Sequence, residues 1–252
     1  MSLTLVGYGF VGKAVYNSLK HSHDIFVVDP AYNTNSIYDQ ESDGYVVCVP
    51  TPMRADGRCE MQHVFEVIEQ IPDNVPILIK STICLEGWEM LCDAFPNKLM
   101  SYSPEFLVAA SADEDFANQK YMLVGGQEVQ FWVDAFSKQF PDMLFYKESV
   151  RDLILIKYAR NSFLASKVAF FNDLYDLVVN AGGNWERVRQ GIGMDDRIGL
   201  SHTMVPGPDG ERGFGGACFP KDTAAFVKTA EYFNSKLPIL EAVIEQNRKI
   251  RK

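Results

Sequence analysis

The sequence predicts an α/β protein with a doubly wound parallel sheet, followed by a long helix and a small all-α domain. Short apolar runs alternate with helix-like segments up to about residue 147. The runs are too apolar for a half-exposed sheet and fit parallel strands that helices cover on both faces. From residue 150 the strand-like runs stop, and a segment of about 30 residues has no Pro or Gly before Gly182. We therefore expect one domain over residues 1–148 and a helical one over residues 149–252.

The expected elements follow from the spacing of apolar residues. An apolar run bounded by turn residues predicts a buried strand, whereas apolar residues three or four apart predict a helix. The expected strands are residues 2–6, 25–29, 45–50, 76–82, 98–104, 121–126 and 143–146. The expected helices are residues 13–20, 63–71, 87–95, 130–140, 150–180, 184–192, 223–233 and 238 to the end, with a Gly/Pro-rich loop over 205–216.

Charge and cysteine content exclude several classes of protein. The 252 residues carry a formal net charge of −9 without a long basic run, so we expect no nucleic acid and no membrane as partners. No stretch approaches the roughly 20 apolar residues of a membrane span, and the first residues do not resemble a signal peptide. The five cysteines are odd in number and lack CxxC spacing, which favours a cytoplasmic protein without a metal site.

Three glycines directly after the first strand form a GxGxxG motif. Gly7 allows a tight turn, Gly9 lets a pyrophosphate approach the backbone, and Gly12 lets helix and strand pack closely. Asp29 ends the second strand about 20 residues later, where an acid binds the ribose hydroxyls. No Arg or Lys occurs between Asp29 and Met53, so the pattern predicts a Rossmann-type site for NAD rather than NADP. The intervening residues Tyr8, Phe10 and Val11 belong to the same candidate site.

Cys218 lies in the segment GFGGACFPKD, residues 213–222. Glycines let the backbone approach a ligand, and Lys221 and Asp222 bring a cation and an acid–base group near the sulfur. A thiol near positive charge gains thiolate character and becomes a nucleophile. Most free cysteines are small buried hydrophobes, an interpretation that suits Cys48 in a strand better than Cys218.

Lys157 and Asn161 are four residues apart, so they share one face of the long helix. Most of this helix is apolar, and a Lys and an Asn on a buried face are costly unless they face a site or solvent. From spacing alone, a functional pair and a solvated stripe remain open alternatives.

Eight motifs occur along the chain: GYGFVG (7–12), VCVPTP (47–52), KSTI (80–83), SPEFL (103–107), KYARN (157–161), FFNDL (170–174), DRIG (196–199) and GFGGACFPKD (213–222). In this order they resemble the UDP-glucose/GDP-mannose dehydrogenase family, from the first strand to nearly the last residue. The resemblance implies oxidation of the C6 alcohol of a nucleotide-linked hexose to a carboxylate, with reduction of two NAD⁺. The implied intermediates are a thiohemiacetal and a thioester on Cys218.

The resemblance also implies a role for each candidate residue. Lys157 and Asn161 would stabilise the developing oxyanion, and Asp222 would help remove the alcohol proton. Glu105 would assist thioester hydrolysis, and Thr82 would help hold water and cofactor. Further cofactor contacts are implied for Pro50, Thr51, Thr82 and Lys221, and substrate contacts for Glu105, Phe106, Leu107, Lys157, Asn161, Arg197, Phe214 and Gly215.

Arg197 would reach the substrate site of a neighbouring subunit. A homodimer would then be the functional unit, with the helix over residues 150–180 at its seam.

The sequence departs from the family pattern in three places. It stops at residue 252, where typical relatives continue into a C-terminal UDP-binding domain, so we expect a short form or a trimmed chain. Ala109 stands where relatives often have a second Glu. The stretch from Arg197 to Cys218 is a few residues longer than in common relatives of this family. Within it, Arg212 is either a partner for a diphosphate, together with Lys221, or a solvated side chain.

Two alternatives to the dehydrogenase of nucleotide-sugars remain. Hydroxyacid dehydrogenases also place Lys and Asn four residues apart on a long helix, but they need no cysteine nucleophile. An NAD-binding or partner-binding subunit would bind cofactor without independent turnover. UDP-glucose is the default substrate, and GDP-mannose and N-acetylated UDP-hexosamines are related ones.

Overall fold

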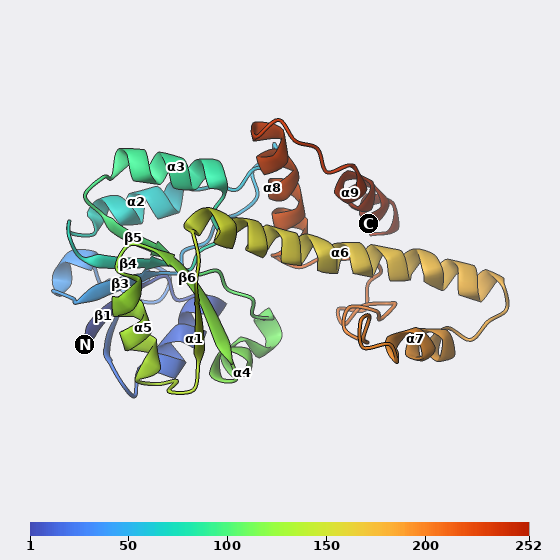
Figure 1. The fold of residues 1–252 in the computed structure, drawn as a ribbon, viewed down its shortest axis with the longest axis horizontal. Coiled ribbons are helices and arrows are strands. Elements are labelled where there is room, and N and C mark those ends of the chain that lie inside the picture. Colours follow the sequence, from blue (N-terminus) through green and yellow to red (C-terminus); the bar gives the residue numbers. More distant parts are fainter. Residues whose placement is uncertain (252) are drawn as a thin grey trace. The chain divides into compact units, whose positions relative to one another are not determined.

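The computed structural model describes residues 1–251 and confirms the α/β class. The chain forms two compact units (Figure 1). The first comprises Met1–Pro52 and Cys59–Lys157, and the second comprises Met53–Arg58 and the chain from Tyr158 onward. Along α6 the two compact units divide between Lys157 and Tyr158. The domain boundary expected at residues 148/149 stays a prediction.

The first unit holds a seven-stranded sheet in the order β2-β1-β3-β4-β5-β6-β7. Five of the six strand pairs are parallel, and only β5 and β6 are antiparallel, with Ser101 opposite Gly126. The apolar pattern could not reveal this reversal, because buried strands read alike in either direction. The strands are β1 (Ser2–Val6), β2 (Asp24–Val28), β3 (Gly44–Val47), β4 (Pro76–Ile79), β5 (Leu99–Tyr102), β6 (Tyr121–Gly126) and β7 (Leu144–Lys147).

Helices cover both faces of this sheet, as the apolar strands predict. Helices α2 (Gln62–Gln70) and α3 (Leu85–Ala94) lie on one face (Figure 1). Helices α1 (Phe10–Leu19), α4 (Ala112–Ala117) and α5 (Val129–Ser137) lie on the other. The spacing of apolar residues did not indicate the six-residue helix α4 or the short 3₁₀ turns Ile37–Asp39 and Ala109–Ser111, because each has fewer than two full turns of pattern.

One hydrophobic cluster of the core of the first unit lies between the sheet and the helices α1, α4 and α5. Its largest side chains are Trp132, Phe116 and Phe136, all fully buried. Truncating such an aromatic side chain to Ala typically costs about 3–5 kcal/mol. The rigid sheet that results fixes the strand ends from which the loops of the candidate site begin.

The second unit is helical, with α6 (Val150–Asn180), α7 (Trp185–Gly193), α8 (Phe219–Tyr232) and α9 (Pro238–Ile250). The first eight residues of α6, Val150–Lys157, belong to the first unit. Helix α8 begins at Phe219, four residues before the expected start, because Pro220 suits the first turn of a helix. Consequently Cys218 directly precedes α8 and Asp222 lies in its first turn. None of the helices within residues 1–251 combines the length and apolarity needed to cross a membrane.

Candidate active site

The glycine motif forms the turn from β1 into α1. Gly7 has a φ of 94°, and a Cβ there would lie 2.6 Å from the carbonyl oxygen of Cys48. A Cβ on Gly12 would overlap the carbonyl oxygen of Gly7, so both positions require glycine. A Cβ on Gly9 would meet nothing within 4 Å, which leaves open space at the start of α1. Phe10 and Val11 begin this helix, where the free backbone N–H groups favour a phosphate.

Asp29 lies beside this turn. Its carboxylate accepts hydrogen bonds from the backbone N–H groups of Tyr8 (2.5 Å) and Ala31 (2.8 Å). The ring of Tyr8 contacts that of Tyr32, with centroids 4.5 Å apart. The glycine turn, the open helix start and the acid together fit a dinucleotide with its diphosphate on α1 and a ribose near Asp29.

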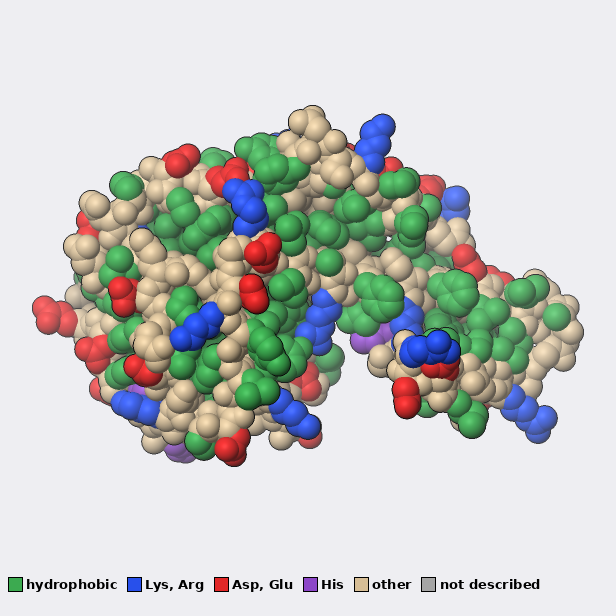
Figure 2. Space-filling model, in the orientation of Figure 1, with side chains coloured by type: hydrophobic (Ala, Val, Ile, Leu, Met, Phe, Trp, Pro, Cys, Tyr) green, Lys and Arg blue, Asp and Glu red, His purple; other side chains and the backbone are tan. Residues whose placement is uncertain are grey.

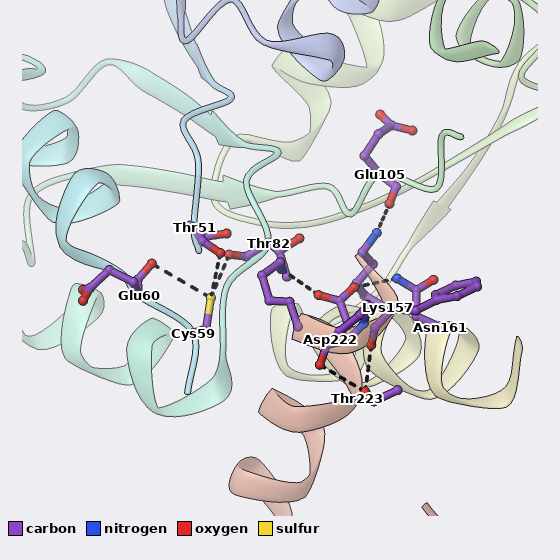
Figure 3. Close-up of polar contacts among 12 residues, drawn as sticks. Thr51, Cys59, Glu60, Thr82, Glu105, Lys157, Asn161, Asp222 and Thr223 are labelled. Atoms are coloured by element: carbon purple, nitrogen blue, oxygen red, sulfur yellow. Dashed lines mark hydrogen bonds and ion pairs between the residues drawn. The ribbon is translucent and has the colours of Figure 1, made fainter. Parts of the chain in front are cut away.

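The loops after β3 and β4 leave the same edge of the sheet, because these strands are parallel neighbours. Pro50 and Thr51 follow β3, and Thr82 follows β4. The buried thiol of Cys59 lies 3.5 Å from the carbonyl oxygen of Thr82 and 4.0 Å from that of Thr51, so it joins the two loops (Figure 3). Sequence reasoning missed Cys59, since no motif surrounds it.

Glu105 has a carboxylate that is fully engaged within the first unit. One oxygen lies 3.0 Å from Nζ of Lys80, and both side chains are buried. The other accepts hydrogen bonds from the amide of Gln119 (3.0 Å) and the backbone N–H of Phe106 (3.1 Å). Sequence reasoning missed Lys80 and Gln119, although Lys80 opens the KSTI motif. Leu107 packs against the core of this unit.

Lys157 is bound to Glu105 through the backbone. Its ammonium donates a hydrogen bond to the carbonyl oxygen of Glu105, while the carboxylate of Glu105 points away from Lys157 (Figure 3). The same ammonium lies 5.2 Å from the ring centroid of Phe106. The SPEFL segment therefore fixes the position of Lys157, and the solvated-stripe alternative does not apply because Lys157 is only 7% exposed.

A second polar group lies within the helical unit. Asn161 donates a hydrogen bond of 2.5 Å to one carboxylate oxygen of Asp222 (Figure 3). Nζ of Lys221 lies 2.6 Å from the other carboxylate oxygen. Asp222 is completely buried, so both partners offset the cost of removing its charge from water. Its backbone N–H donates to the carbonyl oxygen of Cys218 (2.8 Å), which ties the cysteine to the first turn of α8.

Two other cysteines differ from Cys218 in their surroundings. Burial raises the pKa of the Cys48 and Cys84 thiols to about 12, so both stay protonated and unreactive. Cys218, in contrast, is partly exposed and directly precedes α8.

Within the described residues, the side chains of Arg197 and Arg212 form no hydrogen bond or ion pair with the other candidate residues. The side chain of Arg197 is 88% exposed and pairs with Asp195 at 2.5 Å. Arg212 pairs with Asp176 (2.9 Å) on α6, and its guanidinium lies 5.4 Å from the ring of Tyr175. Arg212 is thus held against α6 while its side chain stays 35% exposed, and its contact with a diphosphate stays a prediction.

Solved structures with a similar fold include dehydrogenases of nucleotide-sugars. A UDP-glucose dehydrogenase from the hyperthermophilic archaeon Pyrobaculum islandicum superposes with a TM-score of 0.84 over 98% of this chain and 68% of that one, at 24% identity. The UDP-D-ManNAc dehydrogenase from Pyrococcus horikoshii gives a TM-score of 0.82 over 99% and 69%, at 15% identity. At these identities the likeness establishes the fold.

Sequence comparison establishes the family. The models of the UDP-glucose/GDP-mannose dehydrogenase family match residues 31–138 (NAD binding domain) and residues 154–249 (central domain). The chain belongs to this family, and its first unit is an NAD-binding domain. The UDP-glucose 6-dehydrogenases of Rickettsia felis and Rhizobium meliloti are 34% and 32% identical over 83% and 82% of this chain. The chain spans about half the length of these relatives, 48% and 50% respectively.

Proposed function

We propose that this protein oxidises the C6 alcohol of a nucleotide-linked hexose, with UDP-glucose as the default substrate, to the uronic acid. The observation that carries the proposal is the hydrogen-bonded group of Lys221 and the buried Asn161 and Asp222, tied through one helical turn to Cys218. Helix α6 also carries Lys157 one turn before Asn161. When bound, NAD accepts one hydride in each of two oxidations.

In the first oxidation, Asp222 takes the proton of the C6 hydroxyl, directly or through a water, as the C–H hydrogen leaves as hydride. The product is an aldehyde. Lys157 and Asn161 stabilise the negative charge that develops on the oxygen, and their burial strengthens this electrostatic effect. The family relationship supports these roles, since the motifs KYARN and GFGGACFPKD provide all three residues.

In the second oxidation, the sulfur of Cys218 adds to the aldehyde carbon and the oxygen takes the thiol proton, which gives a thiohemiacetal. Loss of a second hydride and of the hydroxyl proton gives a thioester. Water then adds to the thioester, and the carboxylate leaves as the thiol of Cys218 is restored. We assign the hydrolytic step to Glu105 and Thr82 by family resemblance, with the carboxylate of Glu105 turning from its contacts with Lys80 and Gln119.

We further propose that the functional unit is a homodimer with α6 at its seam. Phe163, Phe170 and Leu177 are seven residues apart on α6, and each is more than 60% exposed. Such spacing puts the three side chains on one stripe, as in helices that pair with one another. Hydrophobic side chains reach the surface along the C-terminal half of α6 (Figure 2). The exposed Arg197 would then be available to the partner's substrate.

The experiment that tests the function counts NADH. The purified chain is given NAD⁺ and, in turn, UDP-glucose, GDP-mannose and an N-acetylated UDP-hexosamine, and the NADH released per sugar consumed is measured. Two NADH per sugar is the expected result, and the best sugar identifies the substrate class. One NADH per sugar would favour a single-step dehydrogenase. No NADH despite NAD binding would favour a binding subunit.

A further inference from the structure

The long loop before Cys218 is held by two buried asparagines from different helices. Asn172 lies on α6 and Asn247 on α9, and they are 1% and 9% exposed. Neither residue belongs to the candidate active site described above. Burying a side-chain amide costs free energy unless its donor and acceptor groups are paired. Both asparagines find hydrogen-bond partners in the loop.

Asn247 binds the backbone of Phe214 in both directions. Its side-chain oxygen accepts a hydrogen bond from the N–H of Phe214 (2.7 Å), and its amide nitrogen donates one to the carbonyl oxygen of Phe214 (2.9 Å). The side chain of Asn247 thus pairs with both backbone groups of Phe214, as a neighbouring strand would in a sheet. A Cβ on the preceding Gly213 would collide with the side-chain oxygen of Asn247, so this close approach requires glycine.

Asn172 binds the residues just before Phe214. Its side-chain oxygen accepts hydrogen bonds from the N–H of Gly213 (3.1 Å) and from Nε of Arg212 (3.3 Å). Its amide nitrogen donates to the carbonyl oxygen of Val168 within α6 (2.9 Å), which fixes the orientation of the side chain. Three consecutive residues, Arg212 to Phe214, are therefore held by two side chains.

The clamped segment contacts the start of α8. The ring of Phe214 is buried and lies edge-on to that of Phe219, with centroids 6.4 Å apart. Phe219 directly follows Cys218. Because hydrogen bonds hold both the N–H and the carbonyl group of Phe214, its ring keeps a fixed position against Phe219. This contact supports the turn that carries the thiol of Cys218.

We propose that Asn172 and Asn247 are positioning residues, which hold residues 212–214 so that the thiol of Cys218 is presented to the substrate carbon. This inference rests on the proposed function, because it names residues that serve the same cysteine. It concerns geometry only: neither asparagine touches the reacting atoms. A misplacement of the order of 1 Å at the reacting centre can cost about 100-fold in rate.

The test compares Asn247→Asp and Asn247→Ala with wild type. The aspartate keeps an acceptor for the N–H of Phe214 and loses the donor, whereas alanine loses both. We expect kcat/KM for UDP-glucose to fall at least about tenfold in the aspartate variant and further in alanine. NAD affinity should stay unchanged, because the glycine turn and Asp29 lie in the other unit and Asn247 contacts none of the candidate cofactor residues. The matched control is Gln246→Ala on the same helix, whose amide binds Asp173 (2.6 Å) and not the loop.

A second readout needs no turnover. The rate at which iodoacetamide alkylates Cys218 is followed by peptide mass mapping, with Cys92 of the first unit as an internal reference. We expect this rate to change at least threefold in both variants and to stay constant in Gln246→Ala. Unchanged kcat/KM and alkylation in folded Asn247 variants would overturn the inference. If wild type releases no NADH, the proposed function fails, and the alkylation rate alone decides whether the asparagine positions the thiol.

Discussion

The side-chain amide of Asn161 on α6 donates a 2.5 Å hydrogen bond to the completely buried carboxylate of Asp222 on α8. This contact joins two helices whose motifs lie 61 residues apart in the chain. Lys221 binds the other carboxylate oxygen, so the two contacts together fix the orientation of the Asp222 carboxylate. In the proposed mechanism, this carboxylate takes the proton of the substrate hydroxyl.

Replacing Asp222 by Asn tests this role with little change in size. The amide cannot act as a base, so we expect kcat to fall about 100- to 10,000-fold while the Kd for NAD stays unchanged. NADH release and cofactor titration measure the two quantities. The control is Asp134→Asn on the exposed side of α5, which should behave as wild type. A kcat within threefold of wild type would exclude Asp222 as the base.

Replacing Cys218 by Ser separates the two oxidations. A serine hydroxyl is a far weaker nucleophile than a thiol, so the aldehyde should form without passing to the thioester. We expect at most one NADH per sugar, and an aldehyde that hydroxylamine traps and mass spectrometry detects. Cys92→Ser in the first unit provides the control. Two NADH per sugar from Cys218→Ser would disprove the covalent mechanism.

Asp29 supports both the glycine turn and the expected ribose contact. Asp29→Ala removes the acceptor for the N–H groups of Tyr8 and Ala31 as well as the acid. Since hydrogen bonds to charged groups contribute about 1.5–3 kcal/mol, we expect the Kd for NAD to rise at least about tenfold. Asp29→Asn keeps an acceptor oxygen and should fall between wild type and alanine. Equal affinity in all three proteins would place the ribose elsewhere.

Much of the fold is visible in the sequence because it depends on local patterns. The strands β1, β3, β4 and β5 are apolar at most positions and are mostly buried. The glycines Gly7 and Gly12 mark a turn that only glycine can form. Such signals lie within a few residues of one another, and a single sequence therefore suffices to predict them.

Contacts between distant segments are not visible in this way. Nothing in the pattern around Lys80 indicates that it pairs with Glu105, and nothing around Arg212 indicates that Asp176 and Tyr175 already bind it. The family resemblance named Glu105, yet the direction of its carboxylate depends on Gln119 and Lys80. These pairings arise from tertiary packing between distant segments, so no local sequence pattern contains both partners.

The exposed stripe on α6 predicts how the proposed dimer fails. Phe170→Asp puts a charge in the centre of an apolar interface, which is unfavourable unless the charge is paired. We expect a monomer by sedimentation at concentrations where wild type is a dimer, with a raised KM for UDP-glucose because Arg197 of a partner would be lost. Tyr38→Asp, at another exposed aromatic position in the first unit, is the control. A dimeric Phe170→Asp would rule out α6 as the seam.

His23 makes the stability of the first unit sensitive to pH. Its Nε2 donates a hydrogen bond to the carbonyl oxygen of Ala135 (2.8 Å), and its buried Nδ1 has no partner within the described residues. Burial lowers the pKa of His23 below its ordinary value of 6.5, and the N-terminal amine and Lys138 lower it further, against the opposing effect of the Ala135 bond. The neutral ring is therefore the form that the folded protein accommodates.

Linkage fixes the sign of this effect. As the pH falls below 6.5, the unfolded chain takes up a proton on His23 before the folded chain does, so the free energy of unfolding decreases until the lowered pKa is reached. We expect His23→Gln, which keeps a donor and cannot titrate, to lose less stability than wild type between about pH 7.5 and 5.5 in urea unfolding. His21→Gln, two residues away and exposed, should lose as much as wild type. The same loss in His23→Gln as in wild type would show that this histidine titrates alike in both states.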